Sequence, residues 1–527
     1  MSSLVGNSAF ADVAHVLSGG RLFLAATQRA DYRVPEKYLS GKDDVTVDWD
    51  GEDDPENPYN WPLWYKMWVS FVLFFMTLFV YMGSSIVTPG LEDLSKDLHM
   101  GRTVSVLSLS LFVWAYGIGP CVLSPLSEIS WIGRNWIYVL GLGLFSIIQV
   151  PTVLVNNAAG FLVLRFIAGF LGSPVLATGG ATMGDIWRMT GGFLNGLAFW
   201  GVGATGGPTI GPVISGYAVQ FKGWRWSIWP LFWATALMWV ITFFTLPETS
   251  GQAILTRRAF MLRKITGNNN LRSEGERWDA QLTVKDLLYE TLCRPIELMF
   301  KEPVLLCTNI YIAYLYGILY CFFEAFPLTF MGRHGFSLGA MGVSYVSGFV
   351  GSVITYALYC IYNNKRVLPG FASGKWRPEN RMEPCFVGGV LFSASMFWFG
   401  WTSFSSVPWI VPLIAFAVYV SSALLLFQGF FAYIGENYPR YMASAYASNG
   451  LVRALVAGGF PLFATQMFER LTIQGGCSLL GGLALLLVPI TVAFYMYGAK
   501  LRAKSRYTGH RPQNVPDIDF DKDVENA

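Results

Sequence analysis

About a dozen long apolar segments constrain the fold of this chain more than any other feature. A helix needs about 20 mostly apolar residues to cross the hydrocarbon core of a bilayer. The segments are centred near Phe75, Phe112, Phe145, Gly172, Gly203, Leu237, Tyr314, Val350, Phe392, Ala417, Val456 and Leu485. Only 13% of the residues are charged, against about 25% in soluble domains. The sequence therefore predicts an all-α membrane protein with 12 transmembrane helices.

Lysine and arginine in the short loops predict how these spans are oriented, because cytosolic loops carry an excess of both. With a cytosolic N-terminus, the inside loops hold Arg134, Arg188, Lys365, Arg366, Lys375, Arg377, Arg381 and Arg440. The outside loops then hold Lys96, Arg102, Lys222, Arg225, Arg333 and Arg470. We therefore expect both termini to be cytosolic. The N-terminus lacks a compact signal peptide, so the first span is expected to direct insertion.

One long internal polar stretch divides the spans into two sets of six. The expected organisation is a cytosolic tail (1–63), a six-helix bundle (64–247), a cytosolic linker (248–301), a second six-helix bundle (302–498) and a cytosolic tail (499–527). The stretch 248–301 is either a disordered tether or a linker with short surface helices. Apolar runs such as 259–262 favour the linker, because they supply one face of an amphipathic helix.

The two halves repeat one pattern at matching positions. Gly184-Asp185, Asn195-Gly-Leu and Gly206-Gly-Pro follow the fourth span; Gly435-Glu436, Asn449-Gly-Leu and Gly458-Gly-Phe-Pro follow the tenth. Three matches in the same order indicate a duplication. Six spans repeated in the same topology predict parallel repeats around an axis along the membrane normal, with a cavity between them near the midplane.

Arg165 lies in the apolar run 161–171, which has no acidic residue. A charge in the middle of a span costs about 2.5–3.5 kcal/mol or more, so it is usually functional. In the alternative interpretation, Arg165 only donates hydrogen bonds to backbone carbonyls between packed helices.

Three acidic residues, Asp185, Glu324 and Glu436, stand in or at the edges of spans. A carboxyl group whose pKa is shifted by burial or by a cation can couple proton binding to a change of exposure. Glu324 shares one helical stripe with Tyr316 and Tyr320, four and eight residues earlier. We expect this stripe to face the cavity; the alternative is that Glu324 is only a polar end of its span.

Several motifs resemble those of the major facilitator superfamily. Gly207, Gly211 and Pro212 lie in a pattern similar to the helix-five motif of drug exporters, from which Ala198 and Ser215 depart. Small residues on that face would let the helix bend and pack closely. Arg165-x3-Gly169 resembles the proton-linked arginine motif of the superfamily.

The loop after the second span also resembles the gating-loop motif of the superfamily, in a stretched form. It reads Ser124-Pro-Leu-Ser-Glu128 and then Gly133-Arg134. The resemblance implies gating roles for Glu128, Arg134, Gly207, Gly211 and Pro212.

Two further motifs narrow the resemblance. Asp54-Pro-Glu-Asn-Pro-Tyr-Asn-Trp-Pro62 precedes the first span and Leu246-Pro-Glu-Thr249 follows the sixth. With them the chain is similar, from about residue 34 to 506, to fungal twelve-span drug:proton antiporters of the benomyl, methotrexate and fluconazole resistance type. That resemblance implies two pseudo-symmetric six-helix bundles and proton-coupled efflux of hydrophobic drugs such as azoles across the plasma membrane.

For single residues, the resemblance implies that Arg165 modulates proton binding and that Asp185 takes part in coupling. Asp185 has a second interpretation from its position at the cytosolic end of its helix. There it would form a latch with Arg134 and Glu128 that holds the outward-facing state. The two roles can be combined in one residue.

Aromatic residues make up 16% of the chain, and an apolar pocket with few polar groups accepts many flat ligands. The expected substrate-contacting residues are Phe199, Trp200, Tyr311, Tyr316, Tyr320, Phe323, Phe427, Gln428 and Asn449. Any one of these aromatic side chains is more often packing than a ligand contact. As a set they predict a hydrophobic cargo.

Other functions remain as alternatives. A proton-linked transporter of a polar natural solute, such as a polyamine or sugar, and a membrane sensor that moves nothing are both compatible with the spans. The chain has no metalloprotease, hydrolase or phosphate-loop motif and no cysteine and histidine spacing for zinc, so we expect neither an enzyme nor a cofactor or metal site. The net charge of +3 gives no reason to expect nucleic-acid binding. The expected partners are the substrate, protons and lipid, and the expected state is a monomer.

Overall fold

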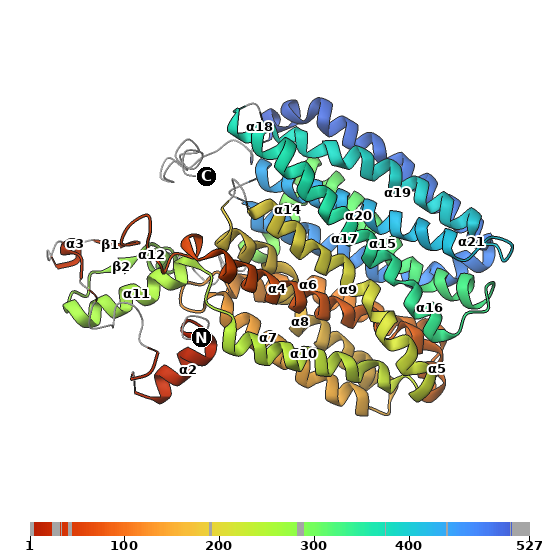
Figure 1. The fold of residues 1–527 in the computed structure, drawn as a ribbon, viewed down its shortest axis with the longest axis horizontal. Coiled ribbons are helices and arrows are strands. Elements are labelled where there is room, and N and C mark those ends of the chain that lie inside the picture. Colours follow the sequence, from red (N-terminus) through yellow and green to blue (C-terminus); the bar gives the residue numbers. More distant parts are fainter. Residues whose placement is uncertain are drawn as a thin grey trace.

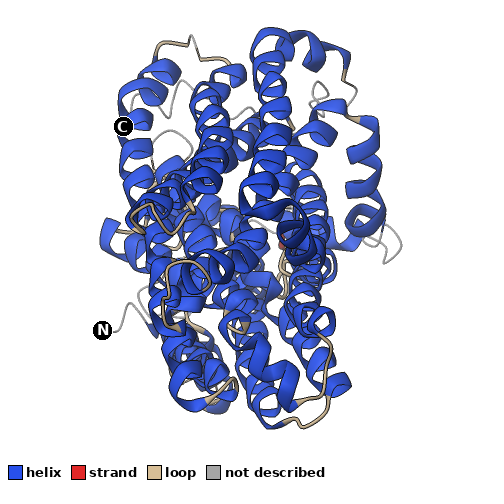
Figure 2. Cartoon of the chain, turned by 90° about the vertical axis from the view of Figure 1, so that its right-hand side faces the viewer, coloured by secondary structure: helices blue, strands red, loops and turns tan. Residues whose placement is uncertain are grey.

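Long helices that run side by side form the body of the molecule (Figure 1). The computed structural model describes residues 5–19, 21–23, 32, 34–39, 45–188, 192–281, 289–374, 376–438, 441–505 and 507. Helices make up almost all of this described chain (Figure 2). The predicted all-α architecture is confirmed. Among the loop cations used for orientation, Lys375 and Arg440 lie outside the described residues, as does most of the C-terminal tail, 508–527.

Six long helices build the N-terminal half. They are α4 (Leu63–Ser85), α6 (Arg102–Leu126), α7 (Gly133–Leu154), α8 (Ala158–Ile186), α9 (Phe193–Lys222) and α10 (Arg225–Thr245). The short helix η3 (Thr88–Gly90) and helix α5 (Leu91–Asp97) connect α4 to α6.

The C-terminal half repeats this arrangement with more interrupted helices. Its long elements are α15 (Pro303–Phe326), α16 (Leu338–Ser344) with α17 (Val346–Tyr362), α19 (Glu383–Thr402), α20 (Ile410–Asn437) and α21 (Met442–Lys504). Shorter elements between them are η5 (Pro327–Met331), η6 (Asn363–Val367), α18 (Leu368–Ala372) and η7 (Pro378–Met382).

The number of membrane crossings follows from length and composition. Ten helices in the described part of the chain are long and apolar enough to span a bilayer. One of them, α21, has 63 residues, and Thr472 breaks its helical backbone with φ 64° and ψ 168°, so it contains two crossings. Helix α9 is as long as the others, but its glycine, threonine and serine residues lower its mean hydropathy. Splitting α21 and adding α9 gives the twelve expected spans.

Small elements gather at one end of the bundle. They include α2 (Ala9–Leu17), α3 (Glu36–Leu39), η2 (Pro58–Asn60), α11 (Gly251–Thr266) and α12 (Glu274–Gln281) (Figure 1). Strands β1 (Thr46–Val47) and β2 (Arg272–Ser273) pair in parallel there, which joins the N-terminal segment to the linker. Elements η4 (Tyr289–Cys293) and α14 (Arg294–Lys301) lead into α15. We call this the cytosolic end, following the orientation expected from the loop charges.

The two halves touch at both ends. At the outer end, Gln220 of α9 accepts a hydrogen bond of 2.8 Å from the backbone N–H of Gly339 on α16. At the cytosolic end, the amide of Asn363 donates to Asn195, at the start of α9, over 3.0 Å. Helix α9 therefore contacts the other half near both of its ends.

Candidate functional site

A buried group of hydroxyls lies between the halves. Tyr320 on α15 donates a hydrogen bond of 2.9 Å to Ser84 on α4, and its oxygen lies 3.2 Å from that of Tyr116 on α6. Tyr316, one turn before Tyr320, donates to the backbone oxygen of Ala204 on α9 over 3.4 Å. Two tyrosines of the predicted α15 stripe therefore contact the N-terminal half directly.

Arg165 lies close to this group and is fully buried. Its guanidinium donates to the backbone oxygens of Gly83 (2.8 Å), Ser84 (3.4 Å) and Ser108 (3.3 Å). It also lies 4.4 Å from the centre of the Phe112 ring. These carbonyl bonds match the structural interpretation of Arg165. Ser84 contacts both side chains, since its backbone oxygen accepts from Arg165 and its hydroxyl accepts from Tyr320. Arg165 is therefore connected through one residue to the buried hydroxyls, which we call the centre.

A second buried arginine, Arg453 on α21, was not expected from the sequence. Its side chain is 7% exposed, and its guanidinium donates to the Tyr81 hydroxyl over 3.3 Å. The guanidinium lies 4.8 Å from the centre of the Tyr316 ring and 5.2 Å from that of Phe427. Arg453 follows the Asn449-Gly-Leu repeat in an apolar run, so the rule that identified Arg165 could have found it.

The other expected substrate residues divide into several groups. Phe427 and Tyr316 surround Arg453, and Phe323 packs on Tyr320 with ring centres 5.5 Å apart. The structure thus brings together Tyr316, Tyr320, Phe323 and Phe427.

Gln428 and Asn449 lie in two different surroundings. The amide of Gln428 donates to the backbone oxygen of Leu197 on α9 over 3.5 Å. The amide of Asn449 donates to Asn309 over 3.0 Å. The Gln428 contact joins the halves, whereas Asn449 and Asn309 both belong to the C-terminal half.

Three aromatic residues of the expected set pack elsewhere. Phe199 stacks on Phe74 with ring centres 4.7 Å apart, beside Tyr356 of α17. Trp200 donates to Thr77 over 2.9 Å within the N-terminal half. Tyr311 packs edge-on against Phe430 within the C-terminal half. These contacts are typical of helix packing.

Glu324 lies at the outer end of α15 and is 6% exposed. It accepts a hydrogen bond of 2.7 Å from Thr465 and lies 3.5 Å from Arg102 on α6. Arg102 belongs to the N-terminal half and Glu324 to the C-terminal half, so this pair links the two halves. It lies at the outer side of the interface, where Arg102 is mostly exposed.

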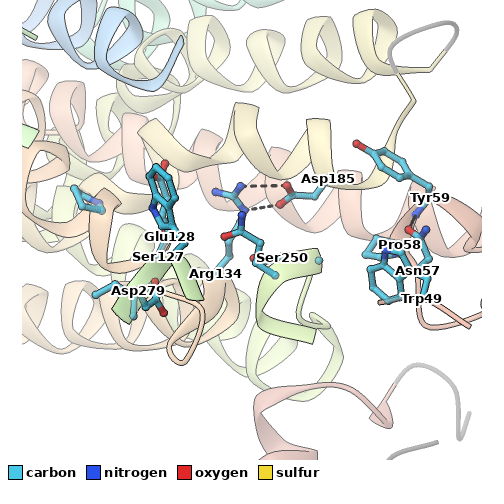
Figure 3. Close-up of a pocket in the computed structure, with 15 residues that line it drawn as sticks. Trp49, Asn57, Pro58, Tyr59, Ser127, Glu128, Arg134, Asp185, Ser250 and Asp279 are labelled. Carbon is cyan, nitrogen blue, oxygen red and sulfur yellow. Dashed lines mark hydrogen bonds and ion pairs between the residues drawn. The ribbon is translucent and has the colours of Figure 1, made fainter. Parts of the chain in front are cut away.

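Asp185 and Arg134 form an ion pair at the cytosolic end (Figure 3). One guanidinium nitrogen of Arg134 lies 3.1 Å from the carboxylate, and a second makes a shorter contact. Thr249 of the Leu-Pro-Glu-Thr motif donates to the same carboxylate over 3.4 Å. Glu128 lines the same cavity but is exposed. All of these groups belong to the N-terminal half and its linker, so the pair fixes α7 to α8 and does not itself bridge the halves.

The neighbouring Glu248 caps the start of α7. Its carboxylate accepts hydrogen bonds from the backbone N–H groups of Arg134 (3.0 Å), Asn135 (3.2 Å) and Ser250 (2.9 Å). A carboxylate at this place also interacts favourably with the helix dipole. Burial nevertheless raises the pKa of Glu248, against the lowering effect of Arg257 and these N–H groups. This role of the Leu-Pro-Glu-Thr motif was not expected from the sequence.

The C-terminal half carries the counterpart of the Asp185 pair. Arg381 on η7 donates to Glu436 at the end of α20 over 2.7 Å, and Trp376 donates to the same carboxylate over 3.4 Å. Asp185 and Glu436 are the acidic residues of the predicted repeat. Each is paired with an arginine at the start of the preceding repeat helix, so the repeat extends to the ion pairs.

Helix α9 packs closely on both halves through its small residues. A Cβ atom on Gly207 would lie 2.6 Å from the backbone oxygen of Leu78 on α4. A Cβ atom on Gly342 of α16 would lie 3.2 Å from the carbonyl carbon of Pro212, and one on Gly216 would lie 3.0 Å from the oxygen of Leu338. Gly211 meets α4 at Met82 in the same way. Bulky side chains at these positions would separate the helices.

The segment before α4 and the linker form a cytosolic cap, which we define as residues 45–61 together with α11, β2 and α12. Arg258 of α11 is its buried centre, donating to Asp54 over 2.7 Å and to Glu56 over 2.6 Å. The Tyr59 hydroxyl donates to the backbone oxygen of Gly184, next to Asp185, over 2.9 Å. The Asp-Pro-Glu-Asn-Pro motif thus connects the linker to the end of α8.

A cavity of about 450 Å³ lies between this cap and the helix ends. Its lining includes Trp49, Tyr59, Glu128, Arg134 and Asp185 (Figure 3). Asp279 of α12 accepts two hydrogen bonds from Ser130, of 3.0 and 2.6 Å, at the same loop. Within the described ranges, no three His, Cys, Asp or Glu side chains are grouped to hold a metal ion.

Comparisons with known proteins agree with this architecture. The family model described as Major Facilitator Superfamily matches residues 73–461. The chain is 43% identical to "Transporter mfs1" of Schizosaccharomyces pombe, over 88% of each chain. It is 41% identical to "Fluconazole resistance protein 1" of Saccharomyces cerevisiae, over 89% of this chain and 86% of the relative.

A third relative covers still more of the chain, and solved structures show the same fold. The chain is 38% identical to "Cycloheximide resistance protein" of Candida maltosa, over 96% of this chain and the whole relative. A partially occluded, inward-open structure of the xylose transporter XylE from E. coli superposes with a TM-score of 0.57 at 14% identity, over 82% of this chain and 99% of that one.

Proposed function

Because the chain belongs to the Major Facilitator Superfamily, we propose that it exports hydrophobic, drug-like molecules across the fungal plasma membrane in exchange for protons. Export proceeds by alternating access, with both termini cytosolic and one chain as the working unit. Relatives named for resistance to fluconazole and cycloheximide, similar over nearly the whole chain, support this class of cargo.

The observation that carries the proposal is the aromatic centre between the halves. Tyr316, Tyr320, Phe323 and Phe427 lie together there, beside a small set of polar groups made of Arg453 and the hydroxyls of Tyr81, Tyr116 and Ser84. Such a surface binds flat apolar molecules of many shapes. A cargo held between the halves is released when they separate at one end and close at the other.

The contacts between the halves support alternating access. The outer contacts include Glu324 with Arg102 and Gln220 with Gly339; the cytosolic contact joins Asn195 and Asn363. Both sets are formed in this structure, so opening to one side requires only that the contacts at that end break while those at the other end hold. Side-chain hydrogen bonds contribute only about 0.5–1.5 kcal/mol each, so a cargo or a proton can shift the balance.

Protons act through two acidic groups, Glu324 in the outer contact between the halves and Asp185 in the pair that fixes α7 to α8. In the proposal, protonation of Glu324 releases Arg102 at the outer end, and protonation of Asp185 releases Arg134 at the cytosolic end. Arg165 acts on the centre through Ser84 and Tyr320. A carboxyl group beside a cation titrates when the cation moves away.

Proteoliposomes with an imposed pH gradient test the proposal. Radiolabelled fluconazole is loaded, and its flux is measured together with proton movement for wild type, Asp185→Asn, Glu324→Gln and Arg165→Ala. Wild type should move drug and protons together, and the variants should lose the gradient-dependent part. Glu92→Gln, in an exposed surface pair with Lys96, is the control and should behave as wild type. Drug flux that persists in wild type after a protonophore collapses the gradient would contradict proton coupling.

A further inference from the structure

Arg453 is a buried cation at the interface of the two halves. It lies on α21 of the C-terminal half, and its guanidinium donates to Tyr81 on α4 of the N-terminal half. The rings of Tyr316 and Phe427 flank it at 4.8 and 5.2 Å. The side chain therefore contacts three helices around the aromatic centre.

The charge of Arg453 has no acidic partner among the described residues, because no carboxylate there lies within 4 Å of it. Two of its three nitrogens, Nε and one terminal nitrogen, are buried and make no hydrogen bond. Arg165 has no carboxylate partner either, but backbone carbonyls accept from two of its nitrogens, and only Nη1 makes no hydrogen bond. An unpaired charge at such a place is costly and is usually functional, as in a substrate or ion pathway.

Packing alone does not account for Arg453. Two ring contacts attract a cation, but they leave Nε and Nη1 without acceptors, and each can donate a charge-assisted hydrogen bond to a carboxylate oxygen. The surface of α21 is open one turn away, at Gly450. Gly450 is on the same face of α21, and a Cβ atom built on it would meet nothing within 4 Å.

We propose that Arg453 is the anion-recognising group of the central site, so that the preferred cargo is a hydrophobic molecule with a carboxylate or similar acidic group. The acid accepts a charge-assisted hydrogen bond from Nε or Nη1 of Arg453, and the apolar part lies against Tyr316 and Phe427. This inference rests on the proposed function in one respect, that the site takes part in transport. The charge preference of the site does not depend on the proposed function.

The same arrangement disfavours hydrophobic cations. Arg165 and Arg453 are both buried near the centre, joined to it through Ser84 and Tyr81. Like charges in a medium of low dielectric constant repel strongly. A polyamine, one of the alternative cargoes, is therefore a poor fit to the centre.

Two dyes with the same ring system test the charge preference. Fluorescein is an anion at neutral pH, and rhodamine 123 is a cation with the same xanthene core. Binding of each to the purified full-length protein in nanodiscs is measured by fluorescence anisotropy. Wild type should bind fluorescein about tenfold more tightly, because one charge-assisted hydrogen bond contributes on the order of that factor.

Variants separate recognition from folding. Arg453→Met should remove the preference for fluorescein, whereas Arg453→Lys, which keeps the charge, should retain part of it. Arg470→Met removes a charge from an exposed position of the same helix and should leave the preference unchanged. Equal or tighter binding of rhodamine 123 to wild type would overturn the proposal, and so would an unchanged preference in Arg453→Met.

The binding assay tests the anion site and the transport assay tests the proposed function, so each hypothesis can be contradicted without the other. A fluorescein preference that depends on Arg453, without proton-linked flux in proteoliposomes, would contradict the proposed function and support the anion site. Proton-linked flux with no such preference would support the proposed function and overturn the anion site.

Discussion

The hydroxyl oxygens of Tyr116 and Tyr320 lie 3.2 Å apart in the buried centre and belong to opposite halves of the molecule. Tyr320 also donates to Ser84, so one side chain of α15 holds two helices of the N-terminal half. Any motion that separates the halves at the centre must break this contact. The free energy of these two hydrogen bonds therefore contributes to the equilibrium between conformations in which the halves are together and apart at the centre.

The first prediction concerns this contact. Tyr320→Phe removes both hydrogen bonds and should shift the equilibrium between conformations by roughly 1–2 kcal/mol. Spin labels at Lys222, the last residue of α9, and at Arg470, beside the break of α21 at Thr472, report the separation of the halves at the outer end, and the fraction at longer distance should rise. Tyr419→Phe is the control, because its hydroxyl donates to Leu315 within the C-terminal half. An unchanged distance distribution in Tyr320→Phe would show that this contact does not hold the halves together.

The second prediction concerns the pair of Asp185 and Arg134, which is mostly buried. Asp185→Asn leaves the arginine without its partner and should lower the free energy of unfolding by roughly 3 kcal/mol. The double variant Asp185→Asn/Arg134→Gln should lose less than the sum of the single variants, because the second substitution removes the unpaired charge. Unfolding of all three is measured beside wild type. Additive losses would mean that the two groups are not coupled.

The third prediction concerns the close contact of α9 with α4. Gly207→Ala places a Cβ atom 2.6 Å from the backbone oxygen of Leu78, so the helices must move apart, at a cost of about 1–3 kcal/mol. The thermal midpoint should fall, and transport should fall with it. Gly459→Ala is the matched control, since nothing lies within 4 Å of its Cβ position. Equal midpoints for the two variants would contradict the close packing.

The fourth prediction concerns the cytosolic cap. Arg258→Gln leaves the buried carboxylate of Asp54 without its cation, and a buried carboxylate without a cation is strongly unfavourable. Hydrogen exchange in residues 45–61 should become faster by at least one order of magnitude, equivalent to about 1.4 kcal/mol. Arg257→Gln, whose partner Asp12 lies on α2, should leave this segment protected. Unchanged exchange in Arg258→Gln would show that other contacts hold the segment.

The fifth prediction concerns pH. Burial of Asp54 favours the neutral form, but hydrogen bonds from Arg258 and from the backbone of Asp50 and Glu56 outweigh it, and the pKa of Asp54 lies below its ordinary value of 3.8. The lowered pKa means that ionised Asp54 stabilises the packing of residues 45–61 on α11 above pH 3.8. This contribution is lost as the pH falls through the lowered pKa.

Labels at Glu36 on α3 and Gln281 on α12 measure this docking as the pH is lowered from 6. The distance between them should lengthen below pH 3.8 in wild type. Asp54→Asn should lack this pH-dependent step, because it has no carboxyl group to titrate at that position. A step of the same size in both proteins would assign it to another group.

The sequence was sufficient for those features that depend on local composition. Apolar segment lengths predicted the spans, because each span must satisfy its own backbone within the bilayer. The repeat predicted Asp185 and Glu436 as equivalent acidic residues, and the structure adds the arginine that pairs with each. The stripe on α15 followed from helical periodicity alone.

The remaining features depended on contacts between distant residues. Phe199, Trp200 and Tyr311 are aromatic residues on apolar spans, as Tyr316 and Tyr320 are, so the sequence does not distinguish them. In the structure they pack against Phe74, Thr77 and Phe430, away from Arg453 and the buried hydroxyls. The side of a helix that faces the centre is set by its neighbours, and an all-apolar span has no polar face from which to predict it.

The sequence by itself determined the membrane-spanning helices, their orientation signals and their duplication, because hydrophobicity and length act within each segment. Only the tertiary structure decided that Arg453 is buried beside Tyr81, 372 positions away along the chain, and that Glu248 caps α7. The partners of a buried charge are chosen by helix packing, and packing brings together residues that no local pattern connects.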